Sequence, residues 1–77
     1  MKIHAHLYGS LRDLLPAEQK GRATLELPAG TTPADVLTQL GIDSFALIAI
    51  NDEHDADHNQ PLQDGDKLAV FMPAAGG

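Results

Sequence analysis

The chain has 77 residues, no cysteine and a formal net charge of −6 at pH 7. This length predicts one domain, and the lack of thiols excludes disulfides, cysteine nucleophiles and cysteine metal sites. The few, scattered lysines and arginines make no phosphate-binding stripe, so nucleic acid is not an expected ligand. No apolar run has the length of a membrane span or a signal peptide, so we expect a soluble, cytoplasmic protein.

Two segments in the first third of the chain alternate apolar and polar residues, which is typical of half-buried strands. They are residues 1–8 and 22–27. The apolar face of the first segment consists of Ile3, Ala5 and Leu7. We therefore expect two strands, each with one face turned to a core.

A short helix is expected between these two strands. Ser10 is a candidate cap for its first turn, with Asp13 three residues later, and Pro16 ends it. The apolar side chains that would share one face of this helix are Leu11, Leu14 and Leu15. The polar residues 17–21 then predict a loop.

The clearest helix signal in the sequence begins at Thr32. Thr32 is the predicted N-cap, Pro33 takes the first helical position, and Asp35 completes a capping box. Gly41 is the expected stop. The apolar stripe of this helix would consist of Val36, Leu37 and Leu40.

Two further strands are expected in the second half. Residues 45–50 are continuously apolar, which predicts a central strand. Residues 51–60 are polar and acidic and predict a loop or a short edge strand, and residues 64–66 (DGD) mark a tight turn. Residues 67–72 alternate again and predict the last strand. One face of this strand would carry Leu68, Val70 and Met72, and Phe71 would lie on the other face.

The order strand, strand, helix, strand, strand predicts an α+β protein of the β-grasp (ubiquitin-like) type. In such a fold, a mixed sheet of four to five strands packs on one main helix and leaves its second face uncovered. We expect residues 1–72 to form this domain and residues 73–77 to form a flexible C-terminal tail.

Several motifs resemble those of a known protein family. They are residues 49–51 (AIN), 60–69 (QPLQDGDKLA) and 71–77 (FMPAAGG), together with residues 8–14 (YGSLRDL). Over nearly the whole chain, this arrangement resembles the ubiquitin-like sulfur carriers of the MoaD/ThiS family. The aromatic-then-proline tail is most similar to the small subunit of molybdopterin synthase.

The resemblance implies that the reacting group is the main-chain carboxylate of Gly77. An adenylating enzyme of the ubiquitin-activating type would use ATP to join this carboxylate to AMP. A sulfurtransferase or other sulfur donor would then displace AMP and leave a nucleophilic thiocarboxylate. Such a carrier binds no cofactor and is not an enzyme on its own. A larger catalytic subunit, such as that of molybdopterin synthase, would receive the tail.

The tail residues are slim, which suits a segment that enters a narrow pocket of a partner, because the pocket walls can approach the backbone closely. The residues expected to thread in this way are Pro73, Ala74, Ala75 and Gly76. Freezing each residue costs about 1–2 kcal/mol. We therefore expect a docking surface on the domain that offsets this cost.

Phe71 is the candidate anchor of that docking surface, since its strand position places it on the sheet face away from the helix. His4 and His6, which share one face of the first strand, are candidates for the same surface. The alternative is that Phe71 only packs on the edge of the sheet.

The histidines do not predict a metal site. His4 and His6 have a spacing that can chelate zinc, and His54 and His58 lie four apart, but no third and fourth ligands accompany either pair. Residues 55–66 imitate the start of a calcium loop but lack its glycine and its terminal glutamate.

Three functions remain open at this point. The first is a sulfur carrier that acts through Gly77, in molybdopterin synthesis or in the thiamine or another sulfur pathway. The second is a ubiquitin-like modifier that forms isopeptide bonds through Gly77. The third is an interaction module whose tail does not react.

Overall fold

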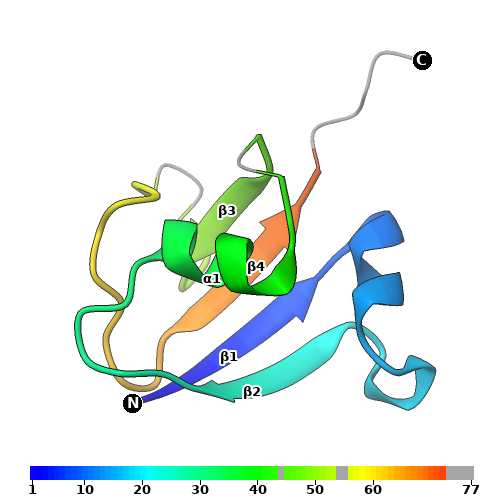
Figure 1. Ribbon diagram of the computed structural model, residues 1–77, viewed down its shortest axis with the longest axis horizontal. Helices are drawn as coiled ribbons and strands as arrows, with labels where there is room; N and C mark the ends of the chain where they lie inside the picture. The colour runs from blue at the N-terminus through cyan, green and yellow to red at the C-terminus, as the bar shows by residue number, and fades with distance from the viewer. Residues whose placement is uncertain (44, 54–55, 73–77) are drawn as a thin grey trace.

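The computed structural model describes residues 1–43, 45–53 and 56–72. Within these residues, four strands form one mixed sheet in the order β2-β1-β4-β3. Their bounds are β1 Lys2–Leu7, β2 Arg22–Glu26, β3 Leu47–Ile50 and β4 Lys67–Phe71. β1 and β4 run parallel in the middle of the sheet, and each outer strand is antiparallel to its neighbour (Figure 1). The sheet and its single α-helix confirm the predicted β-grasp fold.

The helix α1 (Pro33–Leu40) begins and ends where its sequence predicts. The Thr32 hydroxyl oxygen accepts a hydrogen bond from the Asp35 N–H at 3.2 Å, and the Asp35 carboxylate accepts one from the Thr32 N–H at 3.1 Å. Gly41 closes the helix with a left-handed φ of 74°. These reciprocal bonds satisfy two of the amide groups that a helix start leaves without partners.

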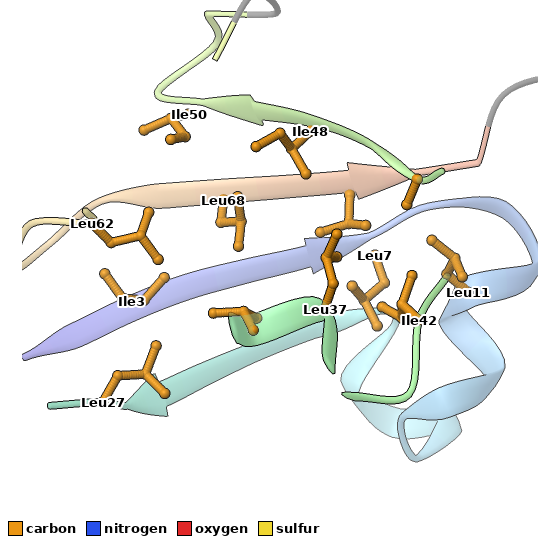
Figure 2. Packing of buried hydrophobic residues seen from close by; sticks show 13 residues of the cluster. Ile3, Leu7, Leu11, Leu27, Leu37, Ile42, Ile48, Ile50, Leu62 and Leu68 are labelled. Atoms are coloured by element: carbon orange, nitrogen blue, oxygen red, sulfur yellow. The ribbon is translucent and has the colours of Figure 1, made fainter. Parts of the chain in front are cut away.

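The hydrophobic core lies between α1 and one face of the sheet (Figure 2). The predicted alternation of β1 is confirmed, because Ile3 and Leu7 are fully buried. Other side chains with at most 2% of their surface exposed come from the helix, from two strands and from the segment before β3: Pro33, Val36, Leu37, Ala46, Ile48, Leu68 and Val70. We call the opposite sheet face, which carries His4 and His6, the open face.

The expectation that residues 45–50 form a central strand is wrong. β3 begins only at Leu47 and is an outer strand, since β1 and β4 occupy the middle of the sheet. The apolar residues of this segment do not share one environment. Ile48 and Ile50 pack in the core cluster, whereas Phe45 is 77% exposed and Leu47 is 45% exposed.

The segment after β1 also differs from its prediction. It is a 3-10 helix, η1 (Gly9–Leu14), and the N-cap position belongs to Tyr8, which makes no side-chain capping bond, and not to Ser10. The predicted apolar face is incomplete, because Leu11 reaches the core whereas Leu14 is half exposed. A second 3-10 helix, η2 (Ala17–Gln19), interrupts the expected loop. Likewise, Met72 lies outside β4 and is 40% exposed.

The DGD turn holds the start of β1 against the start of β4. The Lys2 N–H donates to the Asp64 carboxylate at 2.7 Å, and the Gly65 N–H donates to the Lys2 carbonyl oxygen at 2.8 Å. Asn51 adds a second link, because its side chain accepts from the Lys67 N–H and donates to Asp66, both at 3.0 Å. These motif residues therefore have a structural role at the end of the sheet where β4 begins.

Candidate functional site

The open face is built by alternate residues of all four strands. The strand registers place His6 beside Arg22 and Ala69, and His4 beside Thr24 and Lys67. On the other side of β4, Leu47 pairs with Phe71 and Ala49 pairs with Ala69. Because side chains of directly paired residues point to the same side of a sheet, these residues form one continuous surface.

One end of this surface is aromatic. The rings of His6 and Tyr8 stack with their centroids 4.1 Å apart, and the rings of Tyr8 and Phe71 meet edge to face at 6.1 Å. Tyr8 and Leu47 are each more than 40% exposed, and Phe71 is partly buried beside them. We call Tyr8, Leu47 and Phe71 the aromatic end. The structure thus joins two of the predicted docking residues, Phe71 and His6, through Tyr8.

The aromatic end lies where β4 finishes. β1 runs parallel to β4, so Tyr8, the residue after β1, also lies at this end, and its N–H donates to the Val70 carbonyl oxygen at 3.0 Å. Two more exposed apolar side chains flank the same strand ends: Phe45, two residues before β3, and Met72, one residue after β4. The predicted tail residues Pro73, Ala74, Ala75, Gly76 and Gly77 lie outside the described residues.

Sequence reasoning missed Tyr8 and Leu47 as members of this surface. A signal for Tyr8 is present, because it continues the alternation of His4 and His6. For Leu47 the signal is weaker, since it stands in an unbroken apolar run and only its register opposite Phe71 places it on the open face. His4, which was predicted from the sequence, is exposed and lies farther along the same strand.

A hollow of about 440 Å³ lies on the open face next to the aromatic end. Its charged and polar lining comes from the middle strands, from β2 and from the turn after β3: His4, His6, Tyr8, Arg22, Thr24, Asp52 and Lys67. A hollow of this size is typical of sites that hold a small ligand or a few side chains of a partner. It extends the candidate site from aromatic to charged residues.

The electrostatic environment of His6 follows from this arrangement. Burial, the Arg22 guanidinium and the Arg12 guanidinium each disfavour the imidazolium form and lower the pKa of His6 below its usual value of 6.5. The imidazole is therefore neutral near pH 7. It then offers Tyr8 a stacking partner and adds no further positive charge to the hollow.

The lowered pKa of His6 predicts a pH dependence of stability. As the pH falls through 6.5, the unfolded chain takes up the His6 proton before the folded protein does, so the free energy of unfolding decreases. We expect His6→Gln to lose less stability than the native chain between about pH 7.5 and pH 5.5. Urea unfolding at the two pH values measures this difference, and an equal loss in both proteins would contradict the assignment.

No group of three or more potential metal ligands occurs among residues 1–43, 45–53 and 56–72. The imidazole Nε2 of His58 lies 2.9 Å from the Ala46 carbonyl oxygen and so has a structural hydrogen-bond partner. His54 lies outside the described residues. In the same part of the chain, every helix is too short or too polar to span a bilayer.

Comparisons with known proteins agree with this architecture. The model of the ThiS family matches residues 6–77, whereas no curated protein matches the chain. A similar solved structure is small archaeal modifier protein 1 of H. volcanii, with a TM-score of 0.73 and 17% identity over 94% of this chain and 97% of that one.

Two further similar structures are described in terms of molybdopterin. One, from Pyrococcus furiosus, is named as a candidate molybdopterin converting factor, subunit 1, with a TM-score of 0.75 and 21% identity over 95% of this chain and 98% of that one. The other, from Helicobacter pylori, belongs to a complex of subunits 1 and 2 of molybdopterin-converting factor. It has a TM-score of 0.63 and 19% identity over all of both chains. At these identities the likeness shows a shared fold.

Proposed function

Because the chain belongs to the ThiS family, we propose that it is a ubiquitin-like sulfur carrier that works through a thiocarboxylate on Gly77. The observation that carries this proposal is the position of the aromatic end. Tyr8, Leu47 and Phe71 form a partly exposed apolar surface where β4 finishes, and Phe71 is the first residue of the FMPAAGG motif. A partner that binds this surface also meets the segment that leads to Gly77.

The proposed chemistry explains why a carrier needs an activating partner. A carboxylate resists nucleophilic attack, because its negative charge repels an incoming sulfur. Attack of a Gly77 carboxylate oxygen on the α-phosphorus of ATP forms an acyl adenylate and releases pyrophosphate. A hydrosulfide equivalent from a sulfur donor then attacks the acyl carbon, AMP leaves, and a thiocarboxylate remains. The adenylating enzyme supplies the catalysis, and this chain supplies the reacting group and its placement.

We place the carrier in molybdopterin synthesis, with a larger catalytic subunit as the recipient of the tail. The structural likeness to the H. pylori chain, which is found in a complex with a second subunit, favours this assignment. A second candidate function is protein modification through Gly77, because the H. volcanii protein, whose TM-score of 0.73 is higher than the 0.63 of the H. pylori chain, is described as a modifier.

The decisive experiment is an intact-mass measurement of the chain expressed in its native cells. We expect a species heavier by the difference between sulfur and oxygen, confined by fragmentation to Gly77. Modified lysines on other proteins that carry the Gly76-Gly77 remnant would instead favour the modifier. If both species are missing while the protein supports its cellular role, the tail does not react and the proposal fails.

We expect Phe71→Glu to weaken the binding of the adenylating enzyme by about tenfold or more without unfolding the domain. A carboxylate at this position places a charge against the Tyr8 ring and removes apolar contact area from the aromatic end. Titration calorimetry with the adenylating enzyme from the same organism measures the change.

The matched control for Phe71→Glu is Leu14→Glu, which introduces the same charge at a half-exposed apolar position of η1. The control should bind like the native chain. Unchanged affinity of Phe71→Glu, with a circular dichroism spectrum that shows the native fold, would reject Phe71 as an anchor.

A further inference from the structure

The open face carries positive charge on a protein that is acidic as a whole. The formal net charge of the chain is −6, and lysines and arginines make up only five of its residues. Three of these five lie on the open face, at Lys2, Arg22 and Lys67, and the acidic residue Glu26 pairs there with Lys2 in the strand register. The hollow itself is lined by Arg22 and Lys67 against a single carboxylate, that of Asp52. The local charge is thus opposite in sign to the charge of the molecule.

The two cations flank the histidines from opposite sides. Arg22 on β2 pairs with His6, and Lys67 on β4 pairs with His4, so both cations border the same hollow. Both side chains are exposed. Among the residues that the structure describes, no ion pair neutralises either of them. Their charges are therefore available to a ligand that approaches the open face.

The charged hollow is continuous with the aromatic end. Tyr8 lines the charged hollow and also a second one, which is formed with Ala49, Asp52, Ala69 and Phe71. An occupant of the whole surface therefore needs carboxylates at one end and an apolar side chain at the other. A polyanion such as nucleic acid fits poorly, because the rest of the molecule repels it.

We propose that the open face binds an acidic segment of the partner protein, with carboxylates between Arg22 and Lys67 and an apolar side chain against Tyr8 and Phe71. This inference rests on the docking role of the open face in the proposed function and adds the chemistry of the partner. Charge complementarity of this kind steers association and fixes the orientation of the bound protein. In a partner oriented in this way, the end of β4, from which the tail continues, lies at one edge of the contact with the open face.

The test uses the isotope-labelled full chain and a short capped peptide that alternates glutamate and leucine. The matched peptide has glutamine in place of glutamate. When the acidic peptide is added, we expect the largest amide chemical-shift changes at His4, His6, Arg22 and Lys67. The affinity for this peptide should be about tenfold higher than for the glutamine peptide. Arg22→Glu and Lys67→Glu should each weaken binding of the acidic peptide by about fivefold or more.

The control variant is Lys20→Glu, which changes the net charge by the same amount at an exposed position after η2. It should keep the native affinity within about twofold, because Lys20 lines neither the charged hollow nor the aromatic end. Equal losses in Lys20→Glu and Arg22→Glu, equal binding of the two peptides, or concentration-dependent shifts without peptide would overturn the inference. The last result would assign the open face to a second copy of the chain. A failure here, with Phe71→Glu still weakening the enzyme complex, leaves the proposed carrier function standing.

Discussion

A chain that carries one uncleaved residue after Gly77 is expected to form no thiocarboxylate at all. The added peptide bond converts the Gly77 carboxylate into an amide carbonyl, which has no anionic oxygen to attack the α-phosphorus of ATP. The new carboxylate lies about 3.3–3.6 Å farther along the chain. A reaction that depends on near-contact placement of the reacting atoms loses its geometry at such a displacement. Intact-mass analysis after incubation with the adenylating enzyme, ATP and sulfide measures the product.

Gly77→Ala separates the role of the carboxylate from the role of the slim backbone. This variant keeps a terminal carboxylate at the same position and adds only a methyl group. We expect it to form thiocarboxylate more slowly than the native chain, whereas the extended chain forms none. Full activity of the extended chain would show that Gly77 is not the reacting residue.

The second large effect is expected at a glycine far from the tail. Gly21, which precedes β2, has a φ of +77°, and a Cβ there would lie 2.5 Å from the Leu7 carbonyl oxygen and 2.8 Å from the Arg12 side chain. The Arg12 side chain can move, but the Leu7 oxygen belongs to the backbone at the end of β1. The Leu7 N–H also donates to the Gly21 carbonyl oxygen at 2.6 Å, so both backbones are fixed. We expect Gly21→Ala to destabilise the domain by about 3–5 kcal/mol.

Gly41→Ala is the matched control for Gly21→Ala. Gly41 has a similar φ of +74°, but a Cβ there meets no atom within 4 Å. The control should lose only the cost of a left-handed alanine, about 1–2 kcal/mol. Urea unfolding followed by circular dichroism measures both variants. Since small domains are stable by about 5–15 kcal/mol, the Gly21 variant should be partly unfolded at moderate temperature. Equal losses in the two variants would show that the backbone contact with Leu7 is relieved.

The sequence predicted those elements well whose signals lie entirely in neighbouring residues. The capping box at Thr32 and Asp35 and the glycine stop at Gly41 need only neighbouring residues, so the helix was predicted to its ends. The alternation of β1 likewise identified its buried face. The position of β3 was wrong, because strand order depends on which strands pair across the chain, and apolar content cannot report that pairing.

The candidate site was predicted only in part for a related reason. Phe71, His4 and His6 were identified from their alternation within single strands. The contact of Tyr8 with Phe71 arises from the parallel pairing of β1 with β4, and the charged hollow arises when Arg22 and Lys67 approach from two different strands. These juxtapositions depend on register between segments that lie far apart in the sequence.

The parallel pairing of β1 with β4 also bears on how the molecule is made. The pair His4 and Lys67 joins the first strand to the last, and the bond from Lys2 to Asp64 spans nearly the whole domain. Because synthesis proceeds from the N-terminus, β1 has no central partner until β4 has left the ribosome. Such long-range closure slows folding. It also means that a nascent or truncated chain that lacks β4 completes neither the four-stranded sheet nor the aromatic end. A partner that docks on the aromatic end, as proposed above, would therefore find that surface only on molecules whose translation has passed β4.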